Sequence, residues 1–316
     1  MARYATVSSI AWEAAAGQSA AEALPVAEAL LRQAAREQPD LVIFPECFLL
    51  TGDHTSMWEM ARPLPNPTTD YFAALARELH TNLVIPMLIE EDGRRYNSAV
   101  VLDRRGAIIG HYDKVYPTVG EIENGITPGS GPKVHQLDFG RIGHAICFDI
   151  NFPQPAEEMR AMDVDLICFH SMFTGGQLLN HWALTSGAYL LSAYIEDSRL
   201  IDMTGLDIKC VGRRYEQFDL WKLPPILTAR LNLDRRLFHI DFNCTSPGRD
   251  AKMHKLLAEC AGKVTLDHNF TASVIALGAL EGITLQELIE RYDLEPRNAY
   301  FQRALQAIDG ARTARC

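Results

Sequence analysis

The stretch of chain that decides the fold reads Leu41-Val42-Ile43-Phe44-Pro45-Glu46. Four consecutive apolar residues, ended by a proline, are typical of a short strand that is buried on both faces. Before it, residues 4–10 have the composition of a strand, and residues 20–37 carry Leu24, Ala27, Leu30 and Leu31 at helical spacing. The order strand, helix, strand predicts an α/β fold.

Segments after this stretch add antiparallel pairing. Residues 83–89 and 96–102 read as two strands joined by the polar turn Glu91-Asp92-Gly93-Arg94. Hairpins do not fit a purely parallel sheet, so we expect mixed sheets. Further elements are expected at residues 69–80 (a helix with Thr69 as its N-cap), 107–112, 141–148 and 164–169 (strands) and 181–191 (a helix).

The chain changes character after residue 242. Thr284-Leu285-Gln286-Glu287 has the form of a capping box, in which a threonine and a glutamate begin a helix. We predict two domains, a main domain over residues 1–242 and a mostly helical C-terminal extension over residues 243–316.

Composition narrows the possible partners. Thirty Lys and Arg residues against 40 Asp and Glu residues give a net charge of −10, which argues against nucleic acid or an anionic membrane as the main partner. No apolar run approaches the roughly 20 residues that cross a bilayer, so we expect a cytoplasmic protein. Seven cysteines without a Cys-x-x-Cys pair weigh against a disulfide framework or a zinc ribbon.

Reactive side chains follow three predicted strands. Glu46 follows the strand at 41–44, Lys114 follows the strand at 107–112, and Cys147 lies near the end of the strand at 141–148. Open sheets bind ligands at the carboxyl ends of strands. A carboxylate, an ammonium and a thiol suit covalent attack on a C–N bond. Each residue alone has an ordinary alternative: a core thiol, a capping carboxylate or a solvated lysine.

Three ordered motifs carry a family resemblance. They are the strand ending in Pro45-Glu46, then Lys114-Val115-Tyr116-Pro117-Thr118-Val119-Gly120-Glu121, then Gly143-His144-Ala145-Ile146-Cys147-Phe148-Asp149-Ile150-Asn151-Phe152-Pro153. In their order and separation they resemble the nitrilase superfamily, the carbon–nitrogen hydrolases with a Glu-Lys-Cys triad. The resemblance covers about residues 4–241. It implies a four-layer α-β-β-α sandwich with two mixed sheets, and a homodimer or higher homo-oligomer.

The resemblance also implies catalytic roles. Cys147 is expected as the nucleophile and Glu46 as the general base. Lys114 and the backbone N–H of Phe148 are expected to stabilise the tetrahedral intermediate, and Glu121 to support Lys114. An ammonium between two carboxylates stays charged, and a thiol beside it is expected to ionise more easily. No metal and no organic cofactor is expected.

Two segments depart from the family pattern or leave their role open. Gln154 stands where the family usually has a glutamate, which we expect to alter helix capping rather than chemistry. Residues 207–219 fit the family poorly. Met172 and Phe173 follow another buried strand, where they either line the acyl site together with Phe148 or pack in the core.

The triad allows more than one reaction on a small molecule. Cys147-Phe148-Asp149 differs from the Cys-Trp-Glu of true nitrilases, which favours hydrolysis of an amide through a thioester. The Lys-x-x-Pro-Thr-x-x-Glu motif is frequent in nitrilases, so conversion of a nitrile to acid and ammonia stays open. Hydrolysis of an N-carbamoyl amide is a third possibility. A non-catalytic regulatory homologue is a fourth, although no triad member is replaced.

Overall fold

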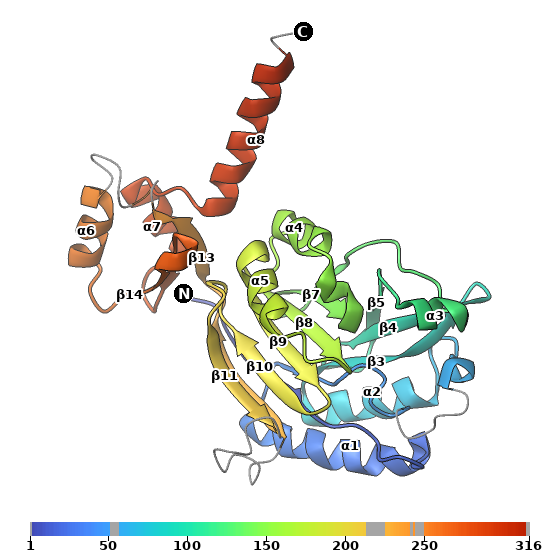
Figure 1. Cartoon of the computed structure of the whole chain (residues 1–316). Coiled ribbons are helices and arrows are strands. Elements are labelled where there is room, and N and C mark those ends of the chain that lie inside the picture. Colours follow the sequence, from blue (N-terminus) through green and yellow to red (C-terminus); the bar gives the residue numbers. More distant parts are fainter. Residues whose placement is uncertain (1, 51–56, 213–224, 241–242, 244–249, 314–316) are drawn as a thin grey trace. The chain divides into compact units, whose positions relative to one another are not determined.

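A computed structural model describes residues 2–50, 57–212, 225–240, 243 and 250–313 (Figure 1). The chain divides into two compact units. The larger unit is formed by Ala5–Asp202 and Asp207–Leu231, and the smaller by the described residues of Met1–Tyr4, Met203–Leu206 and Asn232–Cys316. The predicted domain boundary at 242/243 lies beside residues 241–242 and 244–249, which are outside the described residues, and it stays a prediction.

The first sheet of the larger unit has six strands in the order β12-β1-β2-β3-β4-β5. Strands β1, β2 and β3 pair in parallel, while β3, β4 and β5 pair antiparallel, so the sheet is mixed. The bounds are β1 (Tyr4–Ile10), β2 (Leu41–Ile43), β3 (Asn82–Glu91), β4 (Arg94–Leu102), β5 (Ile108–Asp113) and β12 (Ile226–Asn232).

Helices α1 (Ala20–Ala34) and α2 (Pro67–Leu79) cover one face of this sheet. Ala27 and Leu31 of α1 and Phe72 of α2 share a core cluster with Phe44. The helical spacing read in α1 therefore marks its buried face. The helix predicted at 69–80 begins earlier than expected, because Asn66 rather than Thr69 is its N-cap and accepts the N–H groups of residues 68 and 69.

The second sheet has the order β11-β10-β9-β8-β7-β6, with β7, β8 and β9 parallel and the pairs at both ends antiparallel. Its strands are β6 (Val134–Gln136), β7 (Arg141–Ile146), β8 (Leu166–Ser171), β9 (Tyr189–Tyr194), β10 (Asp197–Ile201) and β11 (Asp207–Gly212). Helices α4 (Gln154–Ala161) and α5 (Gln177–Ser186) share a core cluster with this sheet, in which Trp182 is buried.

The remaining faces of the two sheets contact each other. The Ser9 hydroxyl on β1 donates to the Ser192 carbonyl on β9 at 2.7 Å, and Tyr112 on β5 stacks on His144 of β7 with ring centroids 5.9 Å apart. Helices therefore lie outside and sheets inside, and the predicted four-layer sandwich with two mixed sheets is confirmed (Figure 1). None of the helices in the described ranges combines the length and apolar character that crossing a bilayer requires.

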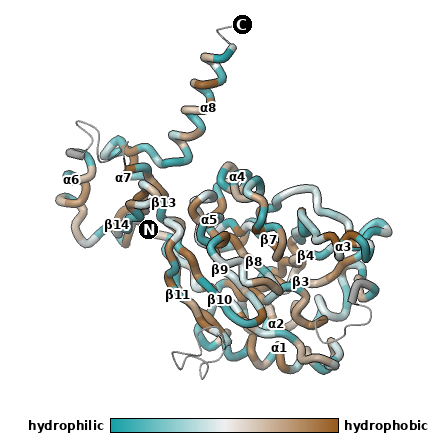
Figure 2. Tube along the Cα trace, in the orientation of Figure 1, coloured by the Kyte–Doolittle hydropathy of each residue, from teal (hydrophilic) through white to brown (hydrophobic). Residues whose placement is uncertain are grey.

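The smaller unit is helical but also contains a sheet that the sequence reading missed. Its antiparallel strands β13 (Arg235–His239), β15 (Val274–Ala279) and β14 (Val264–Asn269) lie in that order. Helices α6 (Asp250–Glu259) and α7 (Leu285–Tyr292) pack with it around Leu277, and α7 begins with the predicted capping box. Helix α8 (Arg297–Thr313) carries hydrophilic and hydrophobic residues interspersed along its length (Figure 2).

Candidate active site

The Lys114 ammonium lies between two buried carboxylates. Its Nζ is 2.9 Å from Oε1 of Glu46, and 3.0 and 2.8 Å from Oε1 and Oε2 of Glu121. Lys114 is only 1% exposed, so these contacts are screened little by water. Lys114 follows β5, Glu46 follows β2, and Glu121 belongs to the short helix α3 (Val119–Glu123). The fold thus brings together three of the predicted site residues.

Helix capping holds Glu121 in this position. Thr118 is the N-cap of α3, and its hydroxyl accepts the N–H of Glu121. In return, Oε2 of Glu121 accepts the Thr118 N–H at 2.7 Å. The same carboxylate therefore closes a capping box and binds Lys114, which leaves it little freedom to rotate.

Asn97 is a site residue that the sequence reading missed. It lies on β4, and its Nδ2 donates to Oε1 of Glu46 and to Oε1 of Glu121, both at 2.8 Å. Its carbonyl also accepts the backbone N–H of Lys114 at 2.8 Å. In the sequence, the one feature that could have pointed to Asn97 is its polar amide, which comes just before the apolar second half of the β4 segment. A buried amide at such a position needs hydrogen-bond partners.

The charges on this cluster follow from its pairing. Burial favours a neutral lysine, but the two carboxylates outweigh it and hold the pKa of Lys114 above its ordinary range. Burial also favours a protonated Glu121, yet Lys114 and Asn97 lower the pKa of that carboxyl. The ammonium is therefore charged at neutral pH, as the sequence reading expected.

Cys147 lies where β7 ends and a short 3₁₀ turn begins, at Cys147–Asn151. Its backbone has φ +46°, a left-handed conformation that is uncommon for a residue with a side chain. Buried Asp149 holds this turn: its Oδ2 accepts the Ile146 N–H and the Tyr112 hydroxyl, and its Oδ1 accepts the Tyr116 N–H, at 2.7–2.8 Å. Burial raises the pKa of Asp149 to about 6.

The electrostatics of the thiol differ from the expectation. Burial and the negative Glu46 raise the pKa of Cys147 to about 12, and the opposing effect of Lys114 is smaller. The predicted easier ionisation is therefore wrong: desolvation and the carboxylate outweigh the ammonium. The thiol is half-buried, not sealed in the core, and keeps its proton next to a carboxylate.

The three predicted pocket side chains are substantially exposed. Phe148 is 38%, Met172 39% and Phe173 44% exposed, so core packing does not account for them. The backbone N–H of Met172 donates to Oε2 of Glu46 at 3.1 Å, which joins the segment after β8 to the cluster. The Phe148 ring packs edge-on against Phe152 at 5.6 Å. Contact of these side chains with a substrate stays a prediction.

The residues that the structure describes contain no group of three or more histidine, cysteine or acidic side chains placed to hold a metal ion. Their cysteines, which are Cys47, Cys147, Cys168, Cys210 and Cys260, are all free thiols.

Solved structures share this fold at low sequence identity. A *Saccharomyces cerevisiae* protein, Nit3 of branch 10 of the nitrilase superfamily, has a TM-score of 0.62 at 19% identity and covers 73% of this chain and 90% of its own. An amidase from *Nesterenkonia* sp. has a TM-score of 0.61 at 17% identity and covers 81% of this chain and 97% of its own. At these identities the likeness shows the fold alone.

Sequence relatives carry different activities. A deaminated glutathione amidase of *Synechocystis* is 26% identical over 175 residues, which are 51% of this chain and 64% of the relative. A bifunctional nitrilase/nitrile hydratase of *Nicotiana tabacum* is 30% identical over 194 residues, which are 54% of this chain and 56% of the relative. The chain thus spans less than two thirds of the length of these relatives.

A family model provides the assignment. The model for carbon–nitrogen hydrolases matches residues 13–194, which are more than half of the chain and include all three motifs. This chain therefore belongs to the carbon–nitrogen hydrolase family, within the nitrilase superfamily that its motifs resemble.

Proposed function

We propose that this protein hydrolyses the C–N bond of a small amide through a thioester on Cys147. The observation that carries the proposal is the buried cluster of Glu46, Lys114 and Glu121, together with the charge of Glu46 that acts on the protonated Cys147 thiol. This arrangement supplies a base beside the nucleophile and a fixed positive charge near the reacting carbon.

In the first half-reaction, Sγ of Cys147 attacks the amide carbon while its proton moves to Glu46. The high pKa of the thiol makes this transfer part of the attack, because little thiolate exists beforehand. The carbonyl oxygen becomes an oxyanion, stabilised by Lys114 and the backbone N–H of Phe148. Glu46 then gives the proton to the nitrogen, the C–N bond breaks, and ammonia or an amine leaves.

In the second half-reaction, Glu46 takes a proton from water, and the oxygen attacks the thioester carbon. A second tetrahedral intermediate forms, stabilised as before. The C–S bond breaks, the sulfur recovers a proton from Glu46, and the carboxylic acid is released. Glu121 supports this cycle by keeping Lys114 charged and in place, because it binds Nζ through both of its oxygens.

The pocket residues are proposed as contacts of the acyl group. Phe148, Met172 and Phe173 expose apolar surface. Met172 and Phe173 directly follow β8, and the backbone N–H of Met172 donates to Oε2 of Glu46 at 3.1 Å. Exposed apolar side chains at an active site gain most from an apolar ligand that covers them. Acyl groups with an alkyl or aromatic part are therefore the first substrates to test.

Hydrolysis of a nitrile is the second candidate, favoured by the 30% identity to the tobacco nitrilase/nitrile hydratase. There the same thiol adds to the C≡N carbon and gives a thioimidate, which water converts to acid and ammonia. Hydrolysis of an N-carbamoyl amide needs the same groups. The same catalytic groups can act on amides, nitriles and N-carbamoyl amides. Which of these the protein hydrolyses therefore has to be measured with a range of substrates.

The experiment is a panel of short amides, nitriles and N-carbamoyl amides, scored for ammonia, with trapped adducts detected by intact mass. We expect amide turnover and an acyl adduct that Cys147→Ala abolishes. Cys210→Ala is the matched control, since it removes another half-buried thiol and is expected to keep both signals. Ammonia release by Cys147→Ala would exclude the mechanism, and a folded protein inert to the whole panel would favour a regulatory role.

We also propose that the protein is a homodimer or higher homo-oligomer, that it is cytoplasmic, and that it acts without a nucleic-acid or membrane partner. Light scattering at working concentration tests the first point, and a monomer would contradict it.

A further inference from the structure

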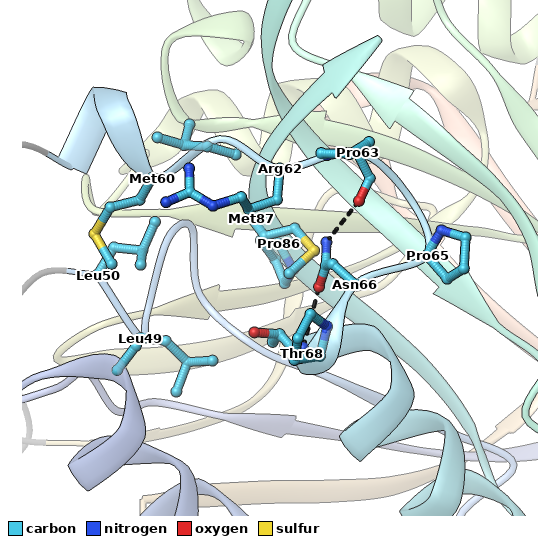
Figure 3. A pocket seen from close by; sticks show the side chains of 13 residues that line it. Leu49, Leu50, Met60, Arg62, Pro63, Pro65, Asn66, Thr68, Pro86 and Met87 are labelled. Carbon is cyan, nitrogen blue, oxygen red and sulfur yellow. Dashed lines mark hydrogen bonds between the residues drawn. The ribbon is translucent and has the colours of Figure 1, made fainter.

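A cavity of about 430 Å³ lies beside the N-terminal end of α2 (Figure 3). This volume is in the range typical of small-molecule sites. Glu46, Lys114 and Cys147 are not among the residues that line it, so it is separate from the catalytic cluster. Its walls are mainly aliphatic, formed by four prolines together with Leu49, Leu50, Met60, Met87 and Leu88.

Arg62 is the only charged side chain that lines this cavity in the described part of the chain. Its Nη1 donates to the carbonyls of Glu59 and Ala61, both at 2.8 Å. The backbone of Arg62 is itself tied to β3, because its carbonyl accepts the Glu90 N–H at 3.0 Å. The guanidinium is therefore held by fixed backbone groups and is not left to swing in solvent.

The other N–H groups of Arg62 remain available to a ligand. A guanidinium has five donors, and the bonds above use only Nη1. Among the described residues, no carboxylate forms an ion pair with Arg62. The Thr68 hydroxyl, which also lines the cavity, has no hydrogen-bond partner within the same residues.

We propose that this cavity binds a carboxylate that carries an aliphatic chain. Flexible leucine and methionine side chains around prolines suit an alkyl chain, whose burial supplies most of the affinity. Arg62 suits the carboxylate, because its planar donors match the two oxygens. A neutral amide or alcohol of the same length can pack against the apolar walls, but it lacks the negative charge that pairs with Arg62.

The cavity also touches the segment that carries the catalytic carboxylate. Leu49 and Leu50 follow Glu46 by three and four residues, and the Leu50 N–H donates to the Cys47 carbonyl at 2.7 Å in a tight turn. An occupant that packs on Leu49 and Leu50 is therefore connected to the active site by one short turn. The binding itself is independent of the proposed function, because it is measured without turnover.

Calorimetric titration with octanoate tests the proposal, with octanol as the uncharged probe. We expect octanoate to bind the wild type and Cys147→Ala equally. Arg62→Gln is expected to weaken octanoate about fivefold and to leave octanol unchanged, while Arg62→Lys, which keeps the charge but not the planar donors, is expected to recover only part of the affinity. Thr68→Trp fills the cavity from a half-buried position in the first turn of α2 and is expected to abolish binding, with Thr68→Ala as the matched open variant. Melting temperatures verify that each variant is folded.

Four results would overturn the proposal: no octanoate binding to the wild type, loss of binding when Cys147 is replaced or alkylated, wild-type affinity in both Arg62→Gln and Thr68→Trp, or equal binding of octanoate and octanol. The second result would assign the ligand to the active site. Equal binding of octanoate and octanol would remove the carboxylate from the proposal and so contradict it.

Discussion

Asn97 and Lys114 share both of their carboxylate partners. The Asn97 amide and the Lys114 ammonium lie 2.8 and 2.9 Å from the same oxygen of Glu46, and 2.8 and 3.0 Å from the same oxygen of Glu121. One positive charge cannot neutralise two carboxylates, and the amide supplies donors without adding charge. Asn97 therefore gives each of the two buried carboxylates a hydrogen bond in addition to the one from Lys114.

Replacing Asn97 with leucine is expected to lower kcat about 10- to 100-fold, because two buried carboxylates each lose a charge-assisted donor. Ser98→Ala is the matched control: Ser98 is the next residue on β4 and bonds Asp113 outside the cluster. It is expected to keep kcat within about threefold. Steady-state kinetics and melting temperatures of both variants check this. Equal losses of activity in the two variants would reduce Asn97 to a packing role.

The sequence predicted the motif residues but not Asn97, for a physical reason. Glu46, Lys114 and Cys147 lie at or just after the ends of strands, and the three ordered motifs of the family resemblance contain them. The position of Asn97 depends on strand register: it lies opposite Leu88 on β3, and its neighbour Ser98 lies opposite Asp113 on β5. A shift by one residue would turn Asn97 away from the carboxylates, and no local signal fixes that register.

Element boundaries failed where tertiary pairing overrides local preference. The helix predicted at 181–191 is observed at Gln177–Ser186 and ends at Gly187, whose φ of +71° suits a glycine after a helix. Tyr189–Tyr194 is instead strand β9, because it pairs with β8. The strand β14 was missed because its side chains are only partly buried and show no clear alternation.

Glu46→Gln is expected to make the thiol more acidic while making the enzyme slower. The carboxylate raises the pKa of Cys147 and Lys114 opposes it, so removing the negative charge lets the pKa fall below about 12. The same change removes the general base, and kcat is expected to fall at least about 100-fold. Ultraviolet absorbance of the thiolate, titrated up to about pH 11 against a Cys147→Ala background, measures the first effect. An unchanged or higher thiol pKa would contradict the electrostatic account.

Asp149→Asn is expected to destabilise the fold by about 2–3 kcal/mol, because Asp149 accepts hydrogen bonds on both oxygens and an amide accepts on only one. Asp103→Asn is the matched control. Asp103 accepts its two backbone N–H groups on Oδ1, which an amide oxygen can replace, and its Oδ2 pairs only with the exposed Arg105 at 3.2 Å, a surface ion pair that contributes little. Urea unfolding of both variants checks the difference. Similar losses of stability would show that the second oxygen of Asp149 contributes little.

We expect the protein to lose stability in mild acid, because several of its histidines have lowered pKa values in the folded state. Burial lowers the pKa of His135 and of His170 to about 4 and holds that of His144 well below its ordinary value, whereas the unfolded chain protonates near 6.5. Between these values the unfolded state binds more protons, so the free energy of unfolding falls as the pH falls. Asp149 and His111 have raised pKa values and act in the opposite direction, but they are fewer.

His144→Gln isolates one of these contributions, because the opposing groups are the same in variant and wild type. Each buried histidine contributes up to about 1.4 kcal/mol per pH unit below 6.5, so the variant is expected to lose stability less steeply by about that amount. Urea unfolding at several pH values from about 7 to 5 gives both slopes. His181→Gln removes an exposed histidine on α5 and is expected to leave the slope unchanged. Parallel slopes for His144→Gln and the wild type would mean that His144 takes up its proton in the folded state as readily as in the unfolded one.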